Sequence, residues 1–343
     1  MSKPKKNTSG CLWIFIFGMM VFFGVAVLDA FLGLNILITI TIVMTGAVYL
    51  TNRWLGKPSA KGIITNVVVV FLIIMILKFL GSLFENVVHE LNPEISFVKE
   101  EGVTKEYIVE NEDTVSVYAS HRIWKDNYGN QFEASLPIRE RDFNRLRNHI
   151  DSYSPSRGGN FWGKLYDYID RTDTPSLDLV MKTFEEIHEE KLLNQMEFAE
   201  MVVSCIQDIP YSFVFQGDCL EPDNYEDSIR RILESCPECC IGNVAYGIQN
   251  PVSFLQNLKG DCDTRTVLIY SILKHFRYDV AILNSDFYRH SILGINLPAK
   301  GINKVYYGKK YVVWETTAKY FTVGELPTNF NDITHWNVVL TSK

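Results

Sequence analysis

The strongest pattern in the chain is a set of three long apolar runs near its N-terminus. They cover residues 11–28, 30–52 and 63–84, and Asp29 alone separates the first two. A helix that crosses a bilayer needs about 20 apolar residues, so we expect about three transmembrane helices within residues 1–84. The first run exceeds the apolar region of a cleaved signal peptide, usually about 7–15 residues, which favours a retained anchor.

The basic residues that flank these runs predict an orientation. Lysines occupy three positions within residues 3–6, and Lys or Arg occupies three within residues 53–61. Because cytoplasmic segments are enriched in Lys and Arg, both segments are expected inside the cell. Three crossings then predict an integral protein of the inner or plasma membrane with a cytoplasmic N-terminus and an extracytoplasmic C-terminal domain. Two crossings would leave that domain in the cytosol.

The remaining sequence mixes period-two and helical patterns, which is typical of an α+β fold. Two apolar-alternating runs around the turn at residues 127–130 predict a β-hairpin. Helical spacing follows it, and the last third reads as a helix followed by several strands. We therefore divide the chain into three parts: an anchor (residues 1–84), a β-hairpin and helical accessory region (85–190), and a core domain (191–343). The core domain contains an irregular insertion with cysteines at residues 212–250.

Charge separates the two ends of the chain. The sequence has 33 basic and 40 acidic residues, of which six basic residues and one acidic residue fall within residues 1–62, so residues 63–343 carry a net charge of −12. Phosphate contacts need clustered Lys and Arg. A nucleic-acid partner is therefore excluded, whereas a lipid bilayer is an expected partner of the apolar runs.

Three separated residues have the chemistry of a nucleophile, a base and an acid. Cys262 stands at the head of an apolar helical run, where unpaired backbone N–H groups and the positive end of the helix dipole favour thiolate. His290 begins a predicted strand, and Glu315 lies on the predicted strand at residues 311–316. Residues on neighbouring strands can meet across a sheet, so these side chains are candidates for a triad.

With these residues in place, the segment around residues 195–325 resembles the transglutaminase-like superfamily, which shares the papain-type fold. The resemblance rests on Gly-Asp-Cys before a buried helix, a His at a strand start, and an acid followed by Thr. It implies a nucleophile helix packed on an antiparallel sheet, with Cys262 as nucleophile, His290 as general base and Glu315 as the group that orients the imidazole. It further implies Gln207 as an oxyanion donor. The usual third member of the triad is Asp, so the Glu is a departure, as is the insertion.

The other polar candidates have plainer interpretations. Asp261 and Asp263 fit helix capping, and His335 offers a rival base near the chain end. Cys219 is expected to form a disulfide with one of three cysteines in the insertion: Cys236, Cys239 or Cys240. The spacing of Cys236 and Cys239 also suits zinc, but no second ligand pair stands at the usual distance, so we expect neither a metal nor a cofactor.

These observations lead to two functional hypotheses. The first is a membrane-anchored thiol enzyme that cleaves or transfers an amide bond, with hydrolysis favoured and a protein or peptide, including a cell-wall peptide, as substrate. The second is a catalytically silent transglutaminase-like domain that serves as a binding or assembly module.

Overall fold

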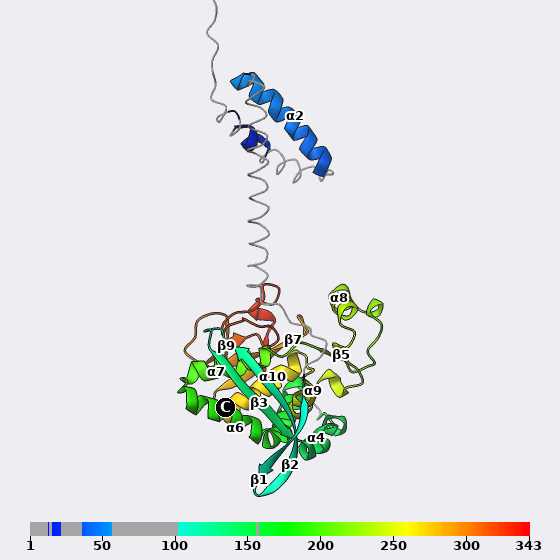
Figure 1. The fold of residues 1–343 in the computed structure, drawn as a ribbon, viewed down its shortest axis with the longest axis vertical. Helices are drawn as coiled ribbons and strands as arrows, with labels where there is room; N and C mark the ends of the chain where they lie inside the picture. Colours follow the sequence, from blue (N-terminus) through cyan, green and yellow to red (C-terminus); the bar gives the residue numbers. More distant parts are fainter. Residues whose placement is uncertain (1–12, 14–15, 22–35, 57–101, 156–157) are drawn as a thin grey trace, which may run out of the picture. The chain divides into compact units, whose positions relative to one another are not determined.

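We describe the protein from a computed structural model. It describes residues 13, 16–21, 36–56, 102–155 and 158–343, which Figure 1 draws as a coloured ribbon.

The N-terminal unit, Met1–Glu90, contains helix α2 (Ile36–Leu55). Among the described residues, we find no helix whose length and apolar character suffice to cross a bilayer. The helix α2 has 20 residues, but its last turn carries Asn52 and Arg53, so its apolar run ends before the helix does. This finding corrects the predicted transmembrane helices and, with them, the predicted integral membrane localisation and orientation. Most of the first apolar run and all of the third lie outside the described residues.

The second unit, Leu91–Lys343, is a mixed helix and sheet domain with two main antiparallel sheets. It holds the predicted accessory region and the predicted core together. The strands of the first sheet, in spatial order, are β1 (Thr104–Glu110), β2 (Asp113–Lys125) and β3 (Gln131–Arg139). Those of the second sheet are β10 (Asn337–Thr341), β6 (Val280–Ser285), β7 (His290–Ile295), β9 (Lys309–Trp314) and β8 (Asn303–Tyr306).

Helices surround and separate these sheets. They are α4 (Glu140–Leu146), α5 (Phe161–Asp173), α6 (Asp178–Lys191), α7 (Gln195–Gln207), α8 (Asp227–Ser235), α9 (Pro251–Asn257) and α10 (Cys262–His275). The helix α10 lies at the centre of the unit, packed against β6 and β7 and against α5, α7 and α9 (Figure 1). Eleven of its fourteen residues are buried, from Cys262 to Leu273 with only Asp263 left out. Neighbouring elements therefore cover this helix on nearly every side, including its polar residues Thr264, Arg265, Thr266 and Ser271.

The turn between β2 and β3 follows from one side chain. Asp126 accepts hydrogen bonds from the backbone N–H groups of Tyr128, at 2.9 Å, and Asn130, at 2.8 Å. Gly129 takes a positive φ of 85°, which glycine adopts without steric cost. The predicted β-hairpin is therefore confirmed, with β3 paired along its length to β2.

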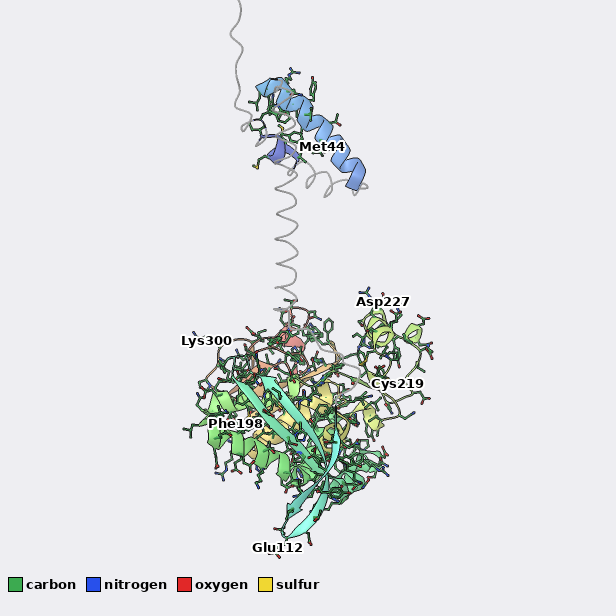
Figure 2. All side chains as sticks on the ribbon, viewed as in Figure 1. Met44, Glu112, Phe198, Cys219, Asp227 and Lys300 are labelled. Atoms are coloured by element: carbon green, nitrogen blue, oxygen red, sulfur yellow. A yellow bond between two sulfur atoms is a disulfide. The ribbon has the colours of Figure 1, made fainter. Side chains whose placement is uncertain are left out.

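The insertion forms a separate wall of the second unit. Its short parallel strands β4 (Phe213–Val214) and β5 (Cys240–Ile241) pair with each other, and α8 lies between them in the chain. Disulfides join Cys219 to Cys240 and Cys236 to Cys239. Figure 1 shows α8 at the margin of the unit, and Figure 2 labels Cys219 and Asp227 on the same segment.

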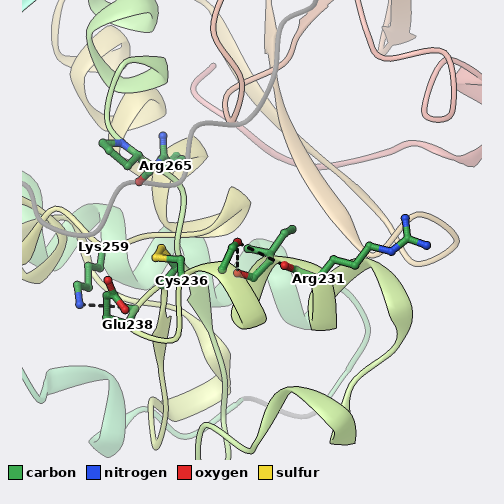
Figure 3. Close-up of a disulfide and its surroundings, with 9 residues drawn as sticks. Arg231, Cys236, Glu238, Lys259 and Arg265 are labelled. Atoms are coloured by element: carbon green, nitrogen blue, oxygen red, sulfur yellow. Dashed lines mark hydrogen bonds between the residues drawn. A yellow bond between two sulfur atoms is a disulfide. The ribbon is translucent and has the colours of Figure 1, made fainter.

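Hydrogen bonds tie this wall to the core. Lys259 donates to the carbonyl of Glu238 at 3.0 Å, next to the Cys236–Cys239 bridge (Figure 3). The backbone N–H of Ser212 donates to the carbonyl of Gly260 at 3.3 Å, and the backbone N–H of Gln249 donates to the hydroxyl of Thr264 at 3.1 Å. Both ends of the insertion are therefore fixed.

Candidate active site

Cys262 is the first residue of α10. The N-cap is Asp261, whose carboxylate accepts the backbone N–H of Thr264 at 3.1 Å, so the predicted capping role of Asp261 is confirmed. Cys262 is a free cysteine with an exposed fraction of 7%. The N–H groups of the first turn have no partner within a helix, so the thiol stands beside backbone donors.

A buried arginine fixes the turn that presents Cys262. Arg265 is fully buried and donates to the carbonyls of Gly260, at 3.0 Å, of Ile206, at 2.8 Å, and of Pro210. Burial lowers the pKa of Arg265 to about 10, so the group stays charged near neutral pH. Its role is structural: it holds the end of α7 against the start of α10.

His290 and Glu315 meet across neighbouring strands. The two carboxylate oxygens of Glu315 lie 3.0 and 3.3 Å from Nε2 of His290. His290 is the first residue of β7, and Glu315 directly follows β9, its neighbour in the sheet. The side chain of Glu315 is 1% exposed and that of His290 is 10% exposed. With Nε2 facing the carboxylate, Nδ1 is the ring nitrogen left for the thiol.

Three hydrogen bonds keep the Glu315 carboxylate ionised and oriented. Oε1 accepts the backbone N–H of Thr316 at 2.9 Å, the N–H of Thr317 at 2.8 Å, and the hydroxyl of Thr317 at 2.7 Å. Burial favours a raised pKa for Glu315, but attraction to His290 and these donors outweigh it, and the net pKa is lowered. The backbone turns toward the carboxylate here, which ends the strand at Trp314, one residue before Glu315.

Cys262 and His290 lie close enough for each to shift the pKa of the other. Burial opposes protonation of His290, but Glu315 and the Cys262 thiolate outweigh it, so the pKa of His290 is raised well above its usual value. Burial and then Asp263 raise the pKa of Cys262, while His290 lowers it. The pKa of Cys262 is therefore raised overall, whereas the helix N-terminus alone was expected to lower it.

A second polar chain reaches the same helix end from α5 and β6. The buried hydroxyl of Tyr166 donates to Asp263 at 2.6 Å and accepts from the amide of Asn284 at 2.8 Å. Burial and then Asp263 raise the pKa of Tyr166 well above its usual value. Sequence reasoning missed this chain, because no local pattern links three residues spread over residues 166–284.

Gln207 lies close to the triad but has other partners. Its amide donates to the backbone carbonyl of Glu315 at 2.7 Å and to that of Phe321 at 3.2 Å. Both amide hydrogens are therefore used, and the structure gives Gln207 a role in holding the Glu315 loop in place of the expected oxyanion contact.

The remaining candidates lie away from the triad chain. His335 stacks on Phe287 with ring centroids 4.1 Å apart, and its Nε2 lies 3.7 Å from Asp332. The structure thus brings His290, not His335, to Glu315 and Cys262. The insertion cysteines are all joined in disulfides. Groups of three or more potential metal ligands do not occur among the described residues.

A cavity of about 410 Å³ opens beside the imidazole. His290, Thr317 and Phe330 border it on the core side, and residues of the insertion form the facing wall. The site therefore combines a buried thiol, an imidazole and a buried carboxylate beside that imidazole, with space next to the ring.

In comparisons with known proteins, the chain matches no family model, no curated protein and no solved structure.

Proposed function

We propose that residues 91–343 form a cysteine enzyme of transglutaminase-like type that acts on an amide bond of a peptide or protein. The observation that supports this most is the chain from Cys262 through His290 to Glu315, with Glu315 buried, held by its two neighbouring threonines, and within 3.0 Å of the ring. A nucleophile in contact with a base that a third group orients is the arrangement used for acyl transfer.

In the proposed reaction the thiol proton passes to His290, and Sγ of Cys262 attacks the carbonyl carbon of the amide. In this proposal the backbone N–H of Cys262, at the start of α10, donates to the oxyanion. The carbon–nitrogen bond then breaks, and His290 gives its proton to the leaving nitrogen. Water attacks the resulting thioester, its hydroxyl joins the acyl group, and its proton returns to the thiol. Hydrolysis is favoured because water is abundant and nothing in the sequence marks an amine site.

The burial of Cys262 supports a second candidate, a catalytically silent binding or assembly module. The thiol is 7% exposed, and burial together with Asp263 raises its pKa. Both features lower the reactivity of a thiol.

Capture of the thioester tests the enzyme proposal. Peptide amides of varied sequence are mixed with the full chain, quenched in acid and mapped by mass spectrometry. We expect an acyl group on Cys262 that hydroxylamine removes, and none in Cys262→Ala. Cys205 is a built-in control, since it is a buried free thiol whose pKa burial raises to about 12. Acyl groups on Cys205 as often as on Cys262 would contradict the proposal.

A further inference from the structure

The cavity beside His290 has an apolar lining drawn from distant parts of the chain. The insertion contributes aromatic rings from β4 and its continuation and aliphatic side chains from α8, and the core contributes two more rings. The apolar lining residues are Phe213, Phe215, Ile229, Ile232, Tyr288 and Phe330. Binding cavities for small ligands usually range from about 300 to 1,000 Å³, so the volume of about 410 Å³ admits a large side chain.

The wall on the insertion side is built before any ligand arrives. Phe213 and Phe215 stack in parallel with ring centroids 5.8 Å apart, and Phe215 stacks on Tyr225 at 5.0 Å. The strand that carries Phe213 pairs with β5, and a disulfide at Cys240 joins β5 to Cys219. A wall cross-linked in this way keeps its shape, which reduces the entropy lost on binding.

The opposite wall is continuous with the catalytic base. Phe330 stacks on the imidazole of His290 with centroids 5.1 Å apart, and Tyr288 packs against Phe330 at 5.4 Å. A side chain that fills the cavity therefore lies directly beside His290, the proposed base.

The charges around the cavity are already paired with each other. Arg289 contacts Glu226 at 3.0 Å, which links the loop before β7 to the start of α8. Because each charge has an opposite partner, neither selects a charged side chain, and the apolar rings decide what the cavity accepts.

We propose that this cavity binds an aromatic or large branched aliphatic side chain of the substrate, at the residue that supplies the acyl group. This inference rests on the proposed function, because it assigns specificity to the same site. The insertion is the part that departs from the resemblance, so the specificity is a property of this chain's own segment at residues 211–232.

The test compares three blocked amino-acid chloromethyl ketones, which alkylate a thiol with loss of chloride: acetyl-Phe, acetyl-Gly and acetyl-Asp. The rate of modification of Cys262 in the full chain is followed by peptide mapping. Burial of a large apolar side chain is expected to make the Phe reagent about 10-fold to 100-fold faster than the Gly reagent. The ratio of the two rates cancels the intrinsic reactivity of the thiol.

Variants of α8 assign that ratio to the cavity. Ile229→Ala and Ile232→Ala each remove part of the lining and should lower the Phe-to-Gly ratio several-fold. Arg231→Ala is the matched control, because Arg231, labelled in Figure 3, is an exposed residue of the same helix. It is not among the residues that line the cavity. It should leave the ratio unchanged.

Failure of the inference and failure of the proposed function give different results. Equal rates for the Phe and Gly reagents, or fastest reaction with the Asp reagent, would overturn the inference about the cavity. The enzyme proposal would still stand if alkylation of Cys262 by iodoacetamide depends on His290. Alkylation of Cys262 that is slow with every reagent and independent of His290 would overturn both.

Discussion

A buried carboxyl group on α7 allows a test of the structure that does not depend on any substrate. Glu200 is 1% exposed. It accepts two hydrogen bonds from Asn127, one from the side-chain amide and one, at 3.3 Å, from the backbone N–H. Burial raises the pKa of Glu200 to about 7, these hydrogen bonds oppose the rise, and repulsion from Asp126 and Glu325 adds to it. The folded protein therefore binds a proton more tightly at this position than the unfolded chain does.

The sign and size of the effect follow from that difference. The pKa rises from 4.5 to about 7 on folding, and each unit corresponds to about 1.4 kcal/mol. The protonated carboxyl stabilises the fold below the unfolded pKa, and this stabilisation is lost as the pH rises from about 4.5 to about 7. The Glu200→Gln side chain stays neutral at every pH, so this variant loses no stability as the pH rises. Its free energy of unfolding relative to wild type should therefore rise by about 3 kcal/mol across this window.

Urea denaturation of the full chain with its disulfides intact, repeated from about pH 4 to pH 9, measures this difference. Other titrating groups are common to both proteins and cancel. Glu189→Gln is the control, because Glu189 is exposed on α6, and its difference from wild type should stay flat. If the difference in unfolding free energy between Glu200→Gln and wild type does not change with pH, the burial of the Glu200 carboxyl group is refuted.

Four further outcomes follow from the site and the insertion. Glu315→Gln should slow turnover by roughly 10²–10⁴, because the amide that keeps the threonine hydrogen bonds turns its NH₂ toward the N–H of His290. Adding Glu315→Gln to His290→Ala should change little, since the acid acts through the imidazole. Asp263→Asn should lower the pKa of Cys262, since the Asp263 charge raises it, and alkylation against pH measures the shift. Without a reductant, the four cysteines of residues 212–250 should take up no thiol label, and all four should label after reduction and unfolding.

Local patterns predicted the elements that place the triad. Strong period-two alternation predicted the hairpin of β2 and β3, and the apolar residues at helical spacing after Thr266 predicted α10. The strand β1 was not predicted, because alternating Lys, Glu and Tyr on an edge strand lack an apolar face. The helix α5 was missed, since its sequence mixes aromatic and acidic residues and its burial depends on contacts with α9, α10 and β10.

Burial depth is what the sequence could not supply at the site. The position of Cys262 at a helix start predicted a lowered pKa, yet desolvation and Asp263 act in the opposite direction and dominate. Gln207 was expected to face the oxyanion, but the carbonyls of Glu315 and Phe321 lie within its reach. Both outcomes depend on which groups the fold brings together across the chain, and spacing along the sequence does not contain that information.

The dependence of Cys262 alkylation on pH, in wild type and in His290→Ala, tests the central claim most directly. Iodoacetamide labels the full chain, and peptide mapping separates Cys262 from Cys205. His290 lowers the pKa of Cys262 in the folded protein, so its removal should move the profile of Cys262 to higher pH and leave that of Cys205 in place. Identical Cys262 profiles in the two proteins would contradict the triad and favour the silent binding module.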